Sequence, residues 1–310
     1  MKLQTALRQY IALKQSLGFR FRSDATILRA FGKAMGAIEL RRVRPACLRR
    51  YLRGRGPVTR FWERKWVGLR GFYRYALARG LVRQSPLPTA VPKMPAPFLP
   101  YIYSSAQLRG LLAAIASSPP RSFTQTTWRT LLLLLYGAGL RISEALNLSD
   151  ADVDLSAGVL TIRCSKFFKT RSVPVGPRLA RLLAAYRHQR ATHKDRAIAS
   201  FFRTHQGTPL RRSTVEAAFR ALCQAAGIQR SDGARYQPRL HDLRHTFAVH
   251  RLIEAYRQGA DVQRLLPQLS TYLGHADLAA TQRYLTLTPE LAHQAALRFE
   301  RYAFSGGDHD

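Results

Sequence analysis

Six prolines fall close together in one short stretch, and they restrict what the whole chain can fold into. They are Pro86, Pro88, Pro92, Pro95, Pro97 and Pro100. Proline fixes φ and has no backbone N–H, so prolines at this density cannot continue a helix or a central strand. We therefore predict an extended connection over residues 86–103. It separates an N-terminal domain, residues 1–85, from a larger domain, residues 104–310, and two domains suit a chain of 310 residues.

The charge of the chain points to a polyanionic partner. Lys and Arg number 50 against 18 Asp and Glu, a formal net charge of +32. Residues 1–90 alone hold 21 Lys and Arg against three acidic residues, a net +18. Such a surplus repels itself unless an anion neutralises it, and nucleic acid is the obvious polyanion. The longest purely apolar run, Leu131 to Leu135, is far too short to span a bilayer, so no membrane partner is expected.

The cysteines and the N-terminus indicate a cytoplasmic protein. Cys47, Cys164 and Cys223 are widely spaced and form no CxxC pair, so neither a disulfide framework nor a zinc ribbon is expected. The first residues form a polar, periodic segment without the pattern of a secretory signal. We expect a cytoplasmic, nucleoid-associated protein.

Four segments of the N-terminal domain carry apolar residues at helical spacing. They lie at about residues 3–19, 24–31, 45–52 and 58–78. Four helices rich in arginine and aromatic residues predict a small bundle that binds the DNA backbone. Most of the aromatic side chains are expected in the core. The alternative is that the arginines form a solvated face, but almost no acidic residues balance them, which favours DNA.

The second domain is predicted to be mostly helical with a β-hairpin. The hairpin comes from two alternating runs, residues 159–163 and 172–175, on either side of a charged turn. Helices are expected from Ser104 or Ser105 onward, over residues 128–146 with a break near Gly137 and Gly139, and at about 177–190, 213–226, 241–257, 261–272, 277–284 and 289–302. Residues 305–310 are predicted to be disordered. The predicted fold is mainly α: a small N-terminal helical bundle and a mixed, mostly α second domain with a small antiparallel β-sheet.

Common catalytic signatures are missing from the sequence. It contains no GxxxxGK[ST], no HExxH and no GxSxG, which argues against the usual NTPases, zinc proteases and hydrolases. Four polar motifs remain in order along the second domain. They are Leu140–Leu146 with Arg141, Ser165–Arg171 with Lys166, His241–Ala248 with His241 and Arg244, and Tyr272–His275 followed nine residues later by Tyr284.

This ordered set resembles the tyrosine site-specific recombinases, also called the phage-integrase family. The motifs cover roughly the last two thirds of the chain, and the basic helical N-terminal domain fits the core-binding domain of that family. A phosphodiester under nucleophilic attack becomes a crowded anionic phosphorus, which cations stabilise. The resemblance gives this task to Arg141 and Arg244, because guanidinium groups match phosphate oxygens and stay charged.

The resemblance also implies the remaining roles. His241 and His275 would hydrogen-bond the phosphate, and Lys166 would give a proton to the 5′-oxygen leaving group. Tyr284 would be the nucleophile, forming a 3′-phosphotyrosyl enzyme. Neither a cofactor nor a metal is implied, because the arginines replace a metal and the ester retains the bond energy.

Alternatives stay open at several positions. The turn lacks both glycines of the family pattern GKGxKxR, so Lys169 competes with Lys166 for the catalytic place. Tyr256 and Tyr272 are rival tyrosines. Glu144 either orients active-site groups or makes a plain helix salt bridge.

The spacing between motifs favours a mobile element. From Arg244 to His275 is 31 residues, longer than in recombinases that resolve chromosome dimers, and the run Leu-Pro-x-Leu-Ser-x-Tyr-Leu-Gly-His resembles recombinases carried by transposons and integrating elements. The leading interpretation is a site-specific recombinase or integrase that cleaves and rejoins DNA for such an element. The alternatives are a type IB topoisomerase-like enzyme that relaxes DNA, a non-catalytic DNA-binding architectural protein and, more weakly, an RNA-binding protein.

The expected partners follow from this interpretation. Two recombining duplexes exchange four strands, and each chain supplies one Tyr284, so we expect a homo-tetramer on paired sites of double-stranded DNA, with accessory recombinases as further partners. A helix over about residues 289–304 carries an apolar stripe of Leu291, Ala295, Ala296, Phe299 and Tyr302. The stripe either docks on a neighbouring protomer, as is common in the family, or packs on its own domain.

We predict that DNA affinity falls steeply with salt. The net +18 of residues 1–90 makes several phosphate contacts plausible. About six such contacts give a slope of about −5 in a plot of log K against log salt concentration. A binding titration over a range of NaCl concentrations measures the slope, and a flat response contradicts a DNA-gripping N-terminal domain.

Overall fold

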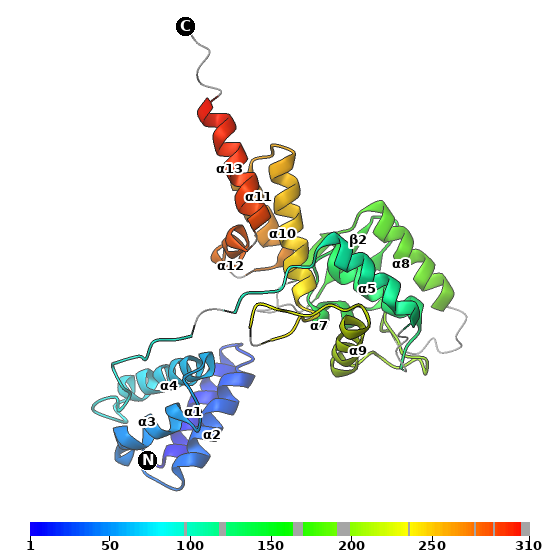
Figure 1. Cartoon of the computed structure of the whole chain (residues 1–310). Helices are drawn as coiled ribbons and strands as arrows, with labels where there is room; N and C mark the ends of the chain where they lie inside the picture. Colours follow the sequence, from blue (N-terminus) through cyan, green and yellow to red (C-terminus); the bar gives the residue numbers. More distant parts are fainter. Residues whose placement is uncertain are drawn as a thin grey trace. The chain divides into compact units, whose positions relative to one another are not determined.

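The computed structural model describes residues 1–95, 98–117, 122–163, 170–190, 199–234, 236–275, 277–287 and 289–304. The chain forms two compact units, Met1–Pro97 and Phe98–Asp310 (Figure 1). Each unit buries its own apolar side chains, so each has a separate hydrophobic core.

Residues 1–95 form a helical bundle. Its helices are α1 (Leu3–Ser16), α2 (Arg22–Met35), α3 (Pro45–Arg53) and α4 (Arg60–Ala78), with the short 3-10 helix η1 (Leu40–Arg42) between α2 and α3. Local sequence sets where the helices begin. Pro45 occupies the first position of α3, where its fixed φ suits a helix and its missing N–H costs nothing. Thr59 caps α4 by accepting a hydrogen bond from the Phe61 N–H.

Aromatic side chains fill the core of the bundle, as predicted for most of them. Phe72 and Tyr73 on α4 are almost completely buried. Lys65, also on α4, is buried as well, and its ammonium group donates to the carbonyl oxygens of Tyr51 (2.7 Å) and Leu52 (2.6 Å). These carbonyls lie near the C-terminal end of α3, where helix carbonyls lack partners within the helix. Lys65 therefore ties α3 to α4.

The second unit is also mostly helical. Its α-helices are α5 (Ser105–Ser117), α6 (Gln125–Gly137), α7 (Ile142–Leu146), α8 (Pro177–Arg190), α9 (Arg212–Ala225), α10 (Asp242–Arg257), α11 (Val262–Leu273), α12 (Ala279–Gln282) and α13 (Pro289–Phe304), joined by the 3-10 helices η2 (Asp150–Asp152) and η4 (Arg283–Thr286). Helix α10 packs against α6, α11 and α13, so it connects the parts of this unit. Figure 1 shows α11 and α13 beside it.

A small antiparallel sheet lies between α7 and α8 in the chain. Its strands, β1 (Val153–Asp154), β2 (Val159–Ile162) and β3 (Arg171–Pro174), lie in the order β1-β2-β3. Leu160 of β2 pairs with Val173 of β3, and both side chains are fully buried on the face that packs on the core. The register therefore follows from the apolar alternation of the two strands.

The predicted fold class is confirmed: the chain is mainly α with a small antiparallel sheet. The predicted hairpin corresponds to β2 and β3, whereas β1 was not predicted. The break expected near Gly137 and Gly139 separates α6 from α7. The single helix predicted at 277–284 is wrong in detail, because a four-residue α12 is followed by the 3-10 helix η4. Residues 305–310, predicted to be disordered, lie outside the described residues.

No helix within the described ranges has both the length and the apolar character needed to cross a membrane.

Gly139 allows α10 to approach the segment before α7 closely. Its φ of +58° lies in the left-handed region, and a Cβ built there would lie 2.5 Å from Cδ1 of Phe247. The carbonyl oxygen of Gly139 accepts a hydrogen bond from Nη1 of Arg244 at 2.7 Å. A residue without a side chain is therefore required at this point in the packing.

We predict that Gly139→Ala lowers the free energy of unfolding by about 2–4 kcal/mol, because a left-handed alanine is strained and its methyl group overlaps Phe247. Thermal unfolding followed by circular dichroism measures the loss. Gly110→Ala is the matched control, since a Cβ at this α5 position meets no atom within 4 Å. The control should leave the stability unchanged or raise it slightly, and equal losses in the two variants contradict the prediction.

Candidate active site

Arg141 is the N-cap residue of α7, and three contacts hold it. Its backbone N–H donates to Oε2 of Glu144 at 3.0 Å, and its Nη1 donates to Oε1 of Glu144 at 2.6 Å. Its Nη2 donates to the carbonyl oxygen of Gly274 at 3.0 Å. Arg141 therefore links the start of α7 to the Leu-Gly-His turn that follows α11.

Glu144 is the shared anion of an arginine cluster, which consists of Arg141, Arg171 and Arg244. It is 8% exposed, and its carboxylate also accepts two hydrogen bonds from Arg171 of β3, at 3.0 and 2.9 Å. Nη1 of Arg244 lies 3.9 Å from Oε2 of Glu144. Burial alone would raise the pKa of Glu144, but hydrogen bonds from Arg171 and from the Arg141 N–H lower it to about 2. Glu144 is therefore ionised in the folded protein near neutral pH, and it binds Arg171 of β3 in addition to forming a salt bridge on its own helix.

Arg244 is the most deeply buried of these arginines. It is 2% exposed, and its guanidinium donates to the carbonyl oxygens of Gly139 at 2.7 Å and Leu273 at 2.5 Å. Burial, and next the charge of Arg141, lower the pKa of Arg244 to about 10, which still leaves it protonated at neutral pH. Its guanidinium joins α10 to the end of α11 and to the segment before α7.

Two histidines lie one helical turn apart beside Arg244. The rings of His241 and His245 meet edge to face, with centroids 4.8 Å apart. Burial lowers the pKa of His245 to about 3, and His241 and the nearby arginines add to this effect. The pKa of His241 is lowered too, by loss of water and by Arg244, although part of its side chain stays exposed. Both rings are neutral at pH 7.

Tyr284 lies on η4 and is 3% exposed. Its hydroxyl oxygen is 3.1 Å from Nδ1 of His245, and its ring centroid is 6.0 Å from that of His275. Burial raises the pKa of Tyr284, while the charges of Arg244 and Arg141 act against that rise. Nδ1 of His275 lies 2.7 Å from the Thr281 hydroxyl on α12, just before η4. Burial, with Arg244 and Arg141, lowers the pKa of His275 to about 4.

The structure thus brings five of the six predicted residues into one continuous set of contacts. Arg141, His241, Arg244, His275 and Tyr284 are joined through Glu144, His245 and the backbone of the Leu-Gly-His turn. Lys166 and its rival Lys169 lie outside the described residues. Cationic arginines beside neutral histidines form a site suited to an anion such as phosphate.

The rival tyrosines have other surroundings. The Tyr272 ring stacks on Phe247, and its hydroxyl donates to the carbonyl oxygen of Pro174 at 3.3 Å. Tyr256 packs against the apolar cluster around α10. Among the described residues, Tyr272 is linked to the arginine cluster by the hydrogen bond from Nε of Arg171 to its carbonyl oxygen, and the charges of Arg171 and Arg244 also act on its phenol.

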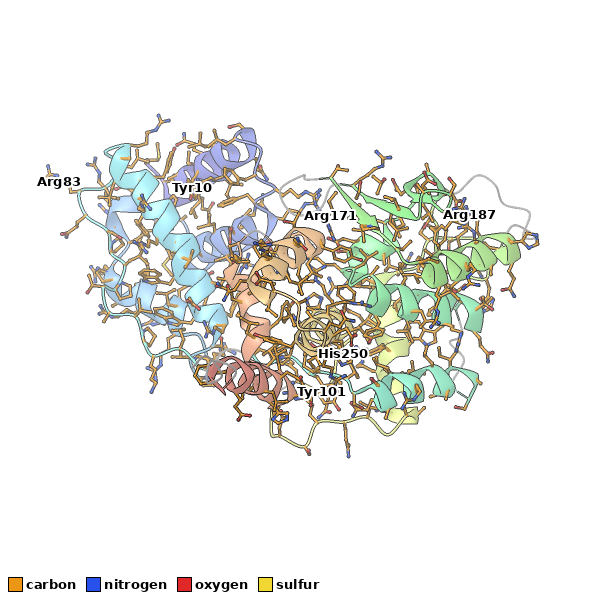
Figure 2. The ribbon with its side chains drawn as sticks, turned by 90° about the horizontal axis from the view of Figure 1, so that it is seen from above. Tyr10, Arg83, Tyr101, Arg171, Arg187 and His250 are labelled. Carbon is orange, nitrogen blue, oxygen red and sulfur yellow. The ribbon has the colours of Figure 1, made fainter. Side chains whose placement is uncertain are left out.

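Two residues of the site were not assigned roles from the sequence. Arg171, labelled in Figure 2, is the last residue of the predicted catalytic turn, and His245 lies four residues after His241 on the same helix face. Both residues lie in motifs that the sequence analysis quotes. The residues that they contact, Glu144 for Arg171 and Tyr284 for His245, lie far away in the chain.

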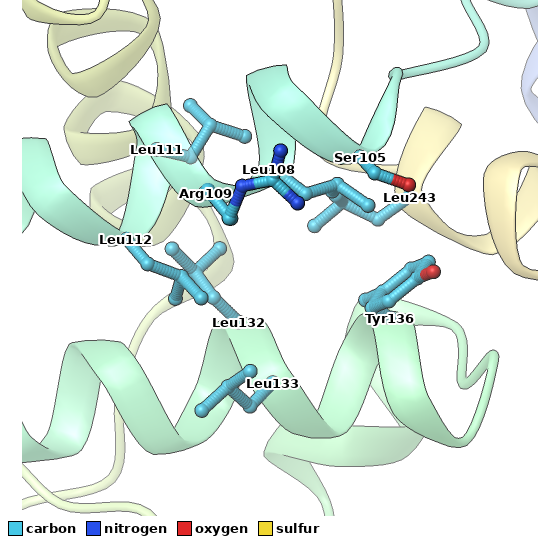
Figure 3. Close-up of a pocket in the computed structure, with 9 residues that line it drawn as sticks. All are labelled: Ser105, Leu108, Arg109, Leu111, Leu112, Leu132, Leu133, Tyr136 and Leu243. Atoms are coloured by element: carbon cyan, nitrogen blue, oxygen red, sulfur yellow. The ribbon is translucent and has the colours of Figure 1, made fainter.

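Nothing in the described part of the chain suggests a metal centre: no group of three or more His, Cys, Asp and Glu is placed to bind one ion there. The pocket drawn in Figure 3 is a separate feature. Leucines of α5 and α6, with Tyr136 and Leu243, line it, and it contains none of the predicted catalytic residues.

In this unit, polar residues from several helices surround the buried Tyr284. Residues 103–290 match the model of the phage integrase family. The chain is 35% identical to y4rB of Sinorhizobium fredii over 96% of each protein, and 36% identical to the tyrosine recombinase XerD of Pseudomonas aeruginosa over 74% of this chain and 72% of that protein. The chain belongs to the phage integrase family and is a tyrosine recombinase, an enzyme of site-specific recombination that cleaves and rejoins DNA.

Solved structures share the fold. The integrase of the transposon Tn1549, in complex with transposon right end DNA, aligns with a TM-score of 0.70 at 16% identity, over 98% of this chain and 100% of that chain. A lambda integrase dimer bound to a core site aligns with a TM-score of 0.64 at 17% identity, over 93% of this chain and 78% of that chain.

We predict that Glu144→Gln lowers the free energy of unfolding at pH 7 by about 3 kcal/mol, because a neutral amide leaves buried arginines without their counterion. The pKa of Glu144 is about 2 in the folded protein and lies near its ordinary value when the chain is unfolded. Its contribution is therefore complete above about pH 5 and is lost as the pH falls toward 2.

The stability difference between wild type and Glu144→Gln should consequently be smaller at pH 3 than at pH 7, as measured by urea unfolding. Glu216→Gln is the control, because the Arg212–Glu216 ion pair is exposed and such pairs contribute little. A difference for Glu144→Gln that does not change with pH contradicts the assignment of the effect to the carboxylate charge.

Proposed function

We propose that Tyr284 is the nucleophile of this recombinase and forms a 3′-phosphotyrosyl bond with DNA. The observation that carries the proposal is the environment of its hydroxyl group. The phenol is buried, yet the charges of Arg244 and Arg141 act on it and oppose the rise in pKa that burial causes. Cations that favour the phenolate also favour the anionic phosphorus that this oxygen would attack.

In the proposed step, a bond forms between Tyr284 Oη and phosphorus, and the bond between phosphorus and the 5′-oxygen breaks. The 5′-oxygen gains a proton, for which we assign Lys166 as the donor, and the proton lost from Oη replaces the one that Lys166 gives, so the net step moves one proton from the phenol to the 5′-oxygen. Arg141 and Arg244 bind the non-bridging oxygens through their guanidinium groups. The ester retains the energy of the broken bond, so rejoining needs no nucleotide.

His241 and His275 complete the proposed phosphate site as neutral hydrogen-bonding groups. Their lowered pKa values keep them uncharged at pH 7, so the arginines supply the positive charge. The contact between His275 and the Thr281 hydroxyl fixes the orientation of that ring relative to the segment that carries Tyr284. Loss of His275 should therefore disturb both the phosphate and the nucleophile.

We further propose that the enzyme moves or integrates a mobile element. The spacing of 31 residues between Arg244 and His275 supports this, as does the overall likeness to the Tn1549 transposon integrase. Sinorhizobium fredii carries two relatives, y4rB and y4rE, each similar to nearly the whole chain, which supports accessory recombinases as partners. Because its substrate is DNA, we assign the enzyme to the nucleoid in the cytoplasm.

A homo-tetramer on paired sites is the proposed working assembly, since each chain offers one Tyr284 for four strands. The two halves of α13 differ in a way that supports contacts between protomers. Leu291 is 1% exposed, and Glu290 pairs with Arg257 of α10 at 2.9 Å, so the first turn packs on its own unit. Phe299, farther along the helix, is 70% exposed and is available to a neighbour.

We predict that Tyr284→Phe abolishes the covalent protein–DNA adduct on a nicked suicide substrate and leaves DNA affinity nearly unchanged, because only the nucleophilic oxygen is removed. Denaturing gels detect the adduct, and gel shifts measure the affinity.

Tyr272→Phe is the control. It removes a hydroxyl that contacts only the Pro174 carbonyl among the described residues, so its adduct should form normally. Adduct formation by Tyr284→Phe, or its loss in Tyr272→Phe alone, assigns the nucleophile to another tyrosine.

A further inference from the structure

The hydroxyl of Tyr284 has a single hydrogen-bond partner among the described residues. That partner is Nδ1 of His245 on α10, at 3.1 Å. The phenol ring lies near two imidazoles, with its centroid 5.6 Å from that of His245 and 6.0 Å from that of His275. Because Tyr284 is 3% exposed, water has little access to satisfy this hydroxyl in its place.

The direction of this hydrogen bond follows from the needs of a buried hydroxyl. Burial raises the pKa of Tyr284, so its oxygen carries a hydrogen at neutral pH. A buried donor without an acceptor is costly and rare, whereas an oxygen with an unused lone pair is tolerated more often. The favoured arrangement is therefore the one in which Tyr284 donates to an unprotonated Nδ1 of His245.

The surroundings of His245 keep its ring neutral. Burial is the main cause of its lowered pKa. Nearby groups also disfavour a protonated ring. They are His241 and Arg239 just before α10, Arg244 on α10 and Arg283 on η4. In the neutral tautomer whose hydrogen is on Nε2, Nδ1 has a lone pair and accepts the hydrogen bond from Tyr284.

We propose that His245 is a positioning residue that stabilises the free phenol of Tyr284 relative to the phosphotyrosyl ester, and so biases the enzyme toward rejoined DNA. The inference rests on the proposed role of Tyr284 as nucleophile. When the ester forms, Oη binds phosphorus and loses its hydrogen, while the 5′-oxygen gains one. Nδ1 of His245 then faces an ester oxygen, which carries no hydrogen to donate, so the hydrogen bond is lost. Rejoining returns the hydrogen to Oη and restores the bond.

The test measures the fraction of protein held as covalent adduct at equilibrium on an intact, un-nicked duplex that contains an end of the element. The full-length protein is used, and denaturant stops the reaction. His245→Leu removes the acceptor, so the adduct fraction should rise about fivefold, the effect of losing one ordinary hydrogen bond. His245→Asn is similar in size to leucine and offers an acceptor oxygen near the place of Nδ1, so its adduct fraction should stay close to that of wild type.

A second histidine–tyrosine pair on the same helix provides a matched control. Nδ1 of His250 lies 2.9 Å from the hydroxyl of Tyr136, away from the arginine cluster (His250 is labelled in Figure 2). His250→Leu should leave the adduct fraction unchanged, which separates the proposed effect from a general weakening of α10. Thermal unfolding and DNA affinity are measured for every variant.

The outcomes separate this inference from the proposed nucleophile. If Tyr284→Phe forms no adduct but His245→Leu has an unchanged or reduced adduct fraction, Tyr284 remains the nucleophile and the role of His245 is overturned. If Tyr284→Phe still forms adduct, both proposals fail. Nitrogen chemical shifts of His245 in the DNA-free protein give an independent result that does not depend on folding of a variant: an unprotonated Nδ1 supports the inference, and a protonated Nδ1 overturns it.

Discussion

The carboxylate of Glu144 accepts hydrogen bonds from Arg141 and Arg171 and lies 3.9 Å from a guanidinium nitrogen of Arg244. These arginines come from the start of α7, from β3 and from α10, and their like charges would drive the three elements apart without a shared counterion. One buried anion therefore allows a hairpin and two helices to meet. The guanidinium groups also bind backbone carbonyls of the turn before His275, so the same ions orient that turn.

Burial and positive charge together decide the ionisation of the other groups. Both lower the pKa values of His245 and His275, which makes neutral hydrogen-bonding partners of residues that usually titrate near neutral pH. For Tyr284 the two influences oppose each other: burial keeps the phenol protonated, while the arginines reduce the cost of ionising it. An incoming phosphate would partly neutralise the arginines and shift each of these balances.

Much of the fold could be predicted from the sequence, because apolar periodicity and proline density report directly on helices, hairpin strands and connections. The strand β1 was missed because two residues, Val153 and Asp154, are too few to show alternation. The short α12 and η4 were predicted as one helix, because the spacing of apolar residues does not distinguish a 3-10 turn from an α-helical turn. The motif residues were identifiable by type and order. The contacts of Arg171 with Glu144 and of His245 with Tyr284 were not, because they join segments 27 and 39 residues apart in the sequence.

The two units of the chain have separate hydrophobic cores. Substitutions that share no contacts usually have additive effects on stability. Substitutions on the surface of residues 1–95 therefore leave intact the hydrophobic cores around Glu144 and its arginines. In evolution the two cores can be altered separately, so that one unit changes its surface while the other keeps the arrangement of its arginine cluster.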